Sequence, residues 1–96
     1  NWFNGKDFPL KTASWIRKSG SVPFIRLMLR STSEEGAREK VYTLQAIIDG
    51  KFDDSLRAWG CSAAEFATPL IVEYGTECNG KWFQWNGFWH GGGRKD

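Results

Sequence analysis

The chain has 96 residues, of which 41% are hydrophobic and 25% charged, so it is long enough for one small folded domain. Its formal charge of +2 comes from 13 basic and 11 acidic residues without a long basic run, which argues against nucleic-acid binding. No stretch approaches the ~18 apolar residues of a membrane span. Aromatic residues make up 16% of the chain, and such a load suits surfaces that stack on flat ligands as well as cores.

The first predicted elements are a helix over residues 10–19 and a strand over residues 22–29. Apolar residues recur at helical spacing in the first segment, and Gly20 follows as a common helix-ending residue. The second segment, "VPFIRLML", is continuously apolar with Pro at its start, which indicates a strand covered on both faces in a parallel sheet. The segment "NWF", residues 1–3, is a candidate for the tail of an earlier strand.

The middle of the chain predicts two helical segments. Residues 31–40 are polar and predict a long loop or a weak helix start, and residues 41–50 predict a helix that closes at a glycine. The clearest helix covers residues 52–67, with Asp53 or Asp54 as its N-terminal cap. Its apolar residues repeat every three to four positions and should form the core-facing stripe: Leu56, Trp59, Ala63 and Phe66.

A second apolar strand is predicted over residues 69–75, "PLIVEYG", and a glycine-rich loop follows it. The order of helix, strand, helices, strand and loop is typical of βα units with parallel strands. Arg26 and Glu73 are charges inside the two apolar strands, so each either reaches the surface or pairs with the other across neighbouring strands in the interior of the domain. We therefore expect a three-stranded parallel α/β fragment in which residues 1–96 form one piece of a larger domain.

The segment "TECNGKWFQWNG", residues 76–87, follows the second strand directly. In α/β proteins, ligands and chemistry gather at the carboxyl ends of parallel strands, which favours a functional role for Glu77. The alternatives are a solvated turn carboxylate at Glu77 and a merely structural packing of the aromatic residues, which is our interpretation for Phe83. Four residues of strand would put Glu73 ~13 Å from Glu77, so these two carboxylates are not expected to form a close pair.

Residues 50–87 resemble glycoside hydrolase family 26, the β-mannanase-like (β/α)8 barrels. The matching positions are Gly50, Phe52, Asp53, Glu77, Asn79, Gly80, Trp82 and Trp85. The resemblance implies a partial TIM barrel covering about strands two to four of eight, with a secreted or extracellular location. It implies that Glu77 is the general acid/base and Trp82 the sugar-stacking residue, and that the nucleophile lies on a later strand. Thr76 stands where the family commonly has His, and Glu73 where it often has Arg.

The function implied is a retaining, endo-acting glycoside hydrolase on β-linked polysaccharide, with β-1,4-mannan first and β-glucan or xylan next. Besides Glu77 and Trp82, the predicted substrate contacts are Asn79, Trp85, Thr76 and His90. The alternative is a glycan-binding protein that uses the same aromatic groove without cleaving. A nucleic-acid role, suggested only by aromatics near basic residues, ranks last.

Cofactors and metals are not expected. Cys61 and Cys78 lack both CxxC and Cys/His metal spacing, so they predict two free thiols, with Cys61 buried. His90 is the only histidine and has no partner ligands at metal-binding spacing.

Overall fold

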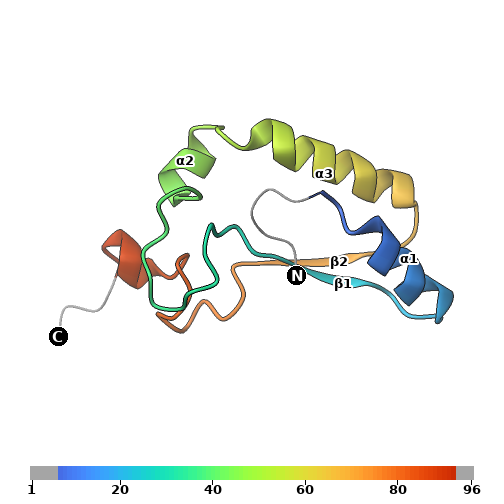
Figure 1. The fold of residues 1–96 in the computed structure, drawn as a ribbon, viewed down its shortest axis with the longest axis horizontal. Helices are drawn as coiled ribbons and strands as arrows, with labels where there is room; N and C mark the ends of the chain where they lie inside the picture. The colour runs from blue at the N-terminus through green and yellow to red at the C-terminus, as the bar shows by residue number, and fades with distance from the viewer. Residues whose placement is uncertain (1–6, 93–96) are drawn as a thin grey trace.

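The structure is a computed structural model that describes residues 7–92. Its elements in chain order are α1 (Leu10–Lys18), β1 (Phe24–Leu27), α2 (Leu44–Ile48), α3 (Asp53–Phe66), β2 (Ile71–Tyr74) and the 3-10 helix η1 (Gly87–His90). In Figure 1, α3 runs along one side of the two strands, and both strands point toward the end of the molecule that carries the long loops and η1.

The helices form where the apolar spacing predicts them, and each ends at a left-handed residue or just before one. Gly20 and Gly50, which follow α1 and α2, have φ angles of 85° and 80°, values that glycine adopts without a steric cost. The Thr43 side chain caps α2 by accepting a hydrogen bond from the Ala46 N–H at 3.1 Å. The predicted aspartate cap of α3 is wrong: the cap position is Phe52, and both aspartates lie in the first turn, where their charge favours the helix dipole.

The two strands pair in parallel, as predicted, with Ile25 opposite Val72 and Arg26 opposite Glu73. The predicted pairing of the two charges is confirmed by a salt bridge of 3.0 Å between Arg26 Nε and Glu73 Oε2. The side chains are 43% and 33% exposed, so the pair lies at a partly solvated surface rather than in a closed interior.

The prediction of three parallel strands and a partial barrel is wrong for the part of the chain that the structure describes. Residues 7–92 contain one sheet of two strands, and the proposed extra strand at residues 1–3 lies outside the described residues. The expectation that both strands are covered on both faces is also wrong, because Phe24, Ile71 and Tyr74 are exposed. The fold is a parallel strand pair joined by a helical connection, with one side of the sheet covered by helices.

The core lies between this covered side of the sheet and the helices. Its buried members are Phe8, Ala13, Ile25, Leu29, Trp59 and Phe66, and the partly buried Leu56 and Ala63 pack against them. The predicted core stripe of α3 is therefore confirmed, including Trp59, whose ring meets that of Phe8 edge-on at 5.2 Å. The prediction that Cys61 is buried is wrong, because it lies on the exposed side of α3.

Arg17 joins the two long helices at one end of the molecule. Its guanidinium donates a 2.7 Å hydrogen bond to the Phe66 carbonyl and lies 3.9 Å from the centre of the Phe66 ring. One of the unpaired carbonyls at the end of α3 thus receives a charged donor. This end of the fold is fixed by α1 and α3, and the opposite end carries the long loops together with the short helices α2 and η1 (Figure 1).

Candidate functional site

The loops that follow β1 and β2 lie together at the carboxyl ends of the strands (Figure 1). Gly36 of the first loop donates its N–H to the Trp82 carbonyl of the second at 2.9 Å. The Gln84 side chain, only 2% exposed, donates to the Glu34 carbonyl at 2.8 Å. These two bonds clamp the loops to each other, so the aromatic segment after β2 has a defined position.

Glu77 occupies an unusual backbone conformation three residues after β2. Its φ of 52° is in the left-handed region, which costs a residue with a side chain about 1 kcal/mol. The Gly80 N–H donates to the Glu77 carbonyl at 3.1 Å and closes a turn. Such backbone strain persists only where the surroundings enforce it, and it is frequent at functional sites.

The side chain of Glu77 is joined to that of Trp82. Trp82 Nε1 donates to Glu77 Oε2 at 2.8 Å, which occupies one of the two carboxylate oxygens. The six-membered ring of Trp82 lies against Gly80 so closely that a Cβ at that position would overlap it. Trp82 is still 41% exposed. The pair thus presents an oriented carboxylate beside an oriented, accessible indole ring.

A second aromatic pair, Phe83 and Trp85, is joined to the backbone just before Glu77. Trp85 Nε1 donates to the Thr76 carbonyl at 2.8 Å, and the Trp85 ring stacks on that of Phe83 at 4.5 Å. Thr76 and Phe83 are buried, which confirms the structural interpretation of Phe83. Thr76 and Trp85 therefore fix the backbone that leads into Glu77.

The outer part of the loop is also held by local bonds. Asn86 Nδ2 donates to the Cys78 carbonyl at 2.7 Å, and Trp89 Nε1 donates to the Lys81 carbonyl at 2.8 Å. His90 Nε2 lies 3.0 Å from the Gln84 carbonyl, which requires a proton on that nitrogen. Asn79 is exposed in the turn between Glu77 and Gly80.

A shallow, solvent-open pocket of about 460 Å³, called the cavity below, lies beside Trp82. Its lining combines three aromatic rings with one acidic and one basic side chain: Trp82, Phe88, Trp89, Glu35 and Lys81, together with Gly36. Cavities of this size and composition are common ligand sites.

Glu39 is a second carboxylate near the end of β1, and it makes four hydrogen bonds. It accepts from the N–H and hydroxyl of Ser31, each at 2.7 Å, and from the N–H groups of Val41 and Tyr42 at 2.9 and 3.0 Å. Burial raises the pKa of the Glu39 carboxyl, but these bonds outweigh that effect and hold the pKa below its ordinary value of 4.5. Glu39 therefore organises the loop after β1 and has little capacity left for a ligand.

Of the residues predicted from the sequence, the structure joins Glu77 to Trp82 and Thr76 to Trp85, whereas the His90 ring is bonded to Gln84. Sequence reasoning missed the residues that complete the cavity and clamp the loops, namely Glu35, Lys81, Phe88, Trp89, Gln84 and Glu39. Only the aromatic content of residues 82–89 pointed to some of them. Their roles depend on contacts between two loops about 50 residues apart.

Comparison with protein-family models, curated proteins and solved structures finds no match for this chain. The resemblance to glycoside hydrolase family 26 thus stays a prediction from the quoted residues. Among residues 7–92, no group of three or more His, Cys, Asp or Glu side chains could hold a metal ion. No helix in the same range is both long and apolar enough to cross a membrane.

Proposed function

We propose that the chain carries the acid/base half of a retaining glycoside hydrolase site for β-linked polysaccharide, with β-1,4-mannan as the first candidate. The observation that carries the proposal is the hydrogen bond of 2.8 Å from Trp82 Nε1 to Glu77 Oε2. It couples a carboxylate to an exposed indole: glycosidic cleavage needs a carboxyl group as proton donor, and an aromatic face offers a surface on which a sugar ring can stack.

In this mechanism Glu77 acts in both halves of a double displacement. As the acid it protonates the leaving glycosidic oxygen while a second carboxylate attacks the anomeric carbon and forms a glycosyl ester. As the base it then takes a proton from the water that attacks this ester, which releases the sugar and restores both carboxyl groups. Trp82 holds the sugar ring, and the strained turn at Glu77 fixes the direction of its carboxyl group.

The second carboxylate has to lie about 5 to 5.5 Å from Glu77 in a retaining enzyme. Glu73 is engaged with Arg26, and Glu39 is saturated by four hydrogen bonds. As the resemblance to glycoside hydrolase family 26 implies, we propose that the nucleophile lies in a further part of a longer polypeptide.

The test is the Glu77→Gln substitution in a polypeptide that includes the natural sequence after Asp96. The amide keeps the size and loses the transferable proton, so hydrolysis of β-mannan should fall by 10²-fold or more, on the order of a lost general acid. An aryl mannoside with a good leaving group needs little protonation, so the rate of its first step should fall much less. Polymer hydrolysis at the wild-type rate by Glu77→Gln would end the catalytic assignment.

A glycan-binding role without cleavage is the second candidate. The observation that favours it is that the exposed Trp82 indole and the exposed carboxylate it bonds can contact a sugar without any second carboxyl group. In that case Glu77 accepts hydrogen bonds from sugar hydroxyl groups. Mannan binding without any cleavage by a longer wild-type protein would support this role over the catalytic one.

A further inference from the structure

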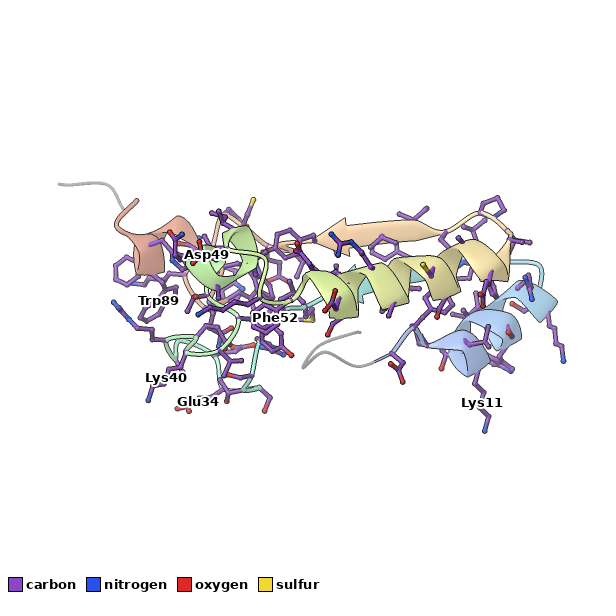
Figure 2. All side chains as sticks on the ribbon, turned by 90° about the horizontal axis from the view of Figure 1, so that it is seen from above. Lys11, Glu34, Lys40, Asp49, Phe52 and Trp89 are labelled. Carbon is purple, nitrogen blue, oxygen red and sulfur yellow. The ribbon has the colours of Figure 1, made fainter. Side chains whose placement is uncertain are left out.

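The cavity beside Trp82 is a site that the proposed reaction does not use. Trp82 belongs to both regions, because its indole N–H bonds Glu77 and its ring lines the cavity. The other wall residues come from the loop after β1, from Lys81 in the loop after β2, and from η1, which carries Phe88 and Trp89. In Figure 2, Trp89 lies at the end of the molecule opposite Lys11 of α1, so the cavity is far from the helical end.

We propose that this cavity binds one additional pyranose unit of the glycan, next to the unit that stacks on the exposed face of Trp82. The inference rests on the proposed function and adds to it a substrate class, oligosaccharides long enough to occupy both positions. It also names residues outside the reacting centre that would set this requirement, above all Phe88 and Lys81.

The wall of the cavity is mainly aromatic and also carries two charged side chains, a combination that suits a sugar ring. Phe88 and Trp89 meet edge-to-face at 5.1 Å with an angle of 88° between their planes, so they form a corner of two aromatic surfaces. A pyranose places its C–H face on such a surface and directs its hydroxyl groups outward. Glu35 and Lys81 then supply an acceptor and donors for those hydroxyl groups.

The wall is largely formed before any ligand arrives. Trp89 is held by its bond to the Lys81 carbonyl, and the Lys81 ammonium lies 5.2 Å from the centre of the Phe88 ring. The Gly36–Trp82 bond keeps the two loops together across the cavity. Little side-chain entropy should therefore be lost on binding, a condition that favours affinity for a small ligand.

The experiment titrates β-1,4-linked manno-oligosaccharides of two to six units into the 96-residue chain and follows binding by calorimetry and by the indole N–H signals in NMR spectra. Wild-type affinity should rise when the oligosaccharide becomes long enough to fill both positions. Phe88→Ala should abolish that rise and weaken binding of the longer ligands by roughly 2- to 10-fold, the scale of one aromatic contact. Phe88→Tyr should retain the rise.

Trp15→Ala is the matched control, because Trp15 is 72% exposed on α1 at the opposite end, and it should bind like the wild type. Equal binding by Phe88→Ala and wild type, with loss only in Trp82→Ala, would overturn the cavity inference and leave the proposed function intact. Binding of a purine nucleoside in the cavity, together with no binding of manno-oligosaccharides there, would also overturn it. Failure of the catalytic proposal is recognised separately, by unimpaired mannan cleavage in the longer Glu77→Gln protein.

Discussion

Glu39 and Glu77 show how two glutamates near the same strand ends come to differ. Glu39 is only 6% exposed and accepts four hydrogen bonds, whereas Glu77 is exposed and accepts one from Trp82. A buried, saturated carboxylate stabilises its loop, and an exposed one remains open to a ligand. The first should matter for stability and the second for function.

We expect Glu39→Gln to lower the free energy of unfolding by about 1–3 kcal/mol near neutral pH, because the amide nitrogen replaces an acceptor of N–H groups. Since the pKa of Glu39 is lowered by folding, its ionised form stabilises the protein above the ordinary value of 4.5, and this contribution is lost as the pH falls through the folded-state pKa. Urea unfolding should therefore show a gap between wild type and variant that closes in acid. Glu34→Gln, at an exposed side chain in the same loop, is the control, and a gap independent of pH would contradict the argument.

Gly80→Ala tests how closely the Trp82 ring packs against Gly80. The added methyl group would overlap the ring, so Trp82 should turn away and its bond to Glu77 should break. We expect a changed Trp82 indole N–H signal in NMR spectra and weaker sugar binding. Gly60→Ala, where the Cβ meets open space on α3, should instead raise stability by about 0.5–1 kcal/mol. An unshifted Trp82 signal in Gly80→Ala would show that the loop absorbs the methyl group at no cost.

At the level of elements, α3 ends in a left-handed residue that is not glycine. Ala67 has a φ of 60° and a backbone N–H bonded to the Ala64 carbonyl. Ala67→Gly should relieve the steric cost of this conformation, and after the larger entropy of the unfolded glycine is subtracted we expect a gain of up to about 1 kcal/mol. Thermal unfolding measures it, with Ala58→Gly in the exposed interior of the same helix as a control that should lose a similar amount. A loss at both positions would mean that the end of α3 does not need glycine geometry.

The sequence was informative about elements whose patterns are local. The spacing of Leu56, Trp59 and Phe66 predicts the buried stripe of α3, and the charges at Arg26 and Glu73 predict the strand pairing that aligns them. The predicted extent of the sheet was wrong because an apolar run indicates that a strand can be buried, but it does not indicate which element covers it. The cavity depended on bonds such as that from Gln84 to Glu34, which join distant loops and leave no periodic signal.

At the scale of the whole molecule, the chain is elongated. Its radius of gyration is 15.0 Å, whereas a compact domain of this length has about 12 Å. The two strands carry helices on one side and expose Phe24 and Ile71. A parallel sheet of two strands with an open side is a weak scaffold on its own. The two loops at its carboxyl end are nevertheless joined to each other by hydrogen bonds that do not involve the open side of the sheet.

This arrangement predicts that the 96-residue chain alone releases no reducing sugar from β-mannan. Double displacement needs two carboxyl groups about 5 to 5.5 Å apart, and the Glu77 side chain is bonded to an indole. The measurement is reducing-sugar release at high protein concentration, with Glu77→Gln as the blank. An aryl mannoside serves as a second substrate, because its cleavage needs a nucleophile but little protonation of the leaving group. Turnover that Glu77→Gln abolishes would contradict the prediction and place the nucleophile inside the chain. Glu35, which shares the cavity wall with Trp82, would then be the first residue to replace.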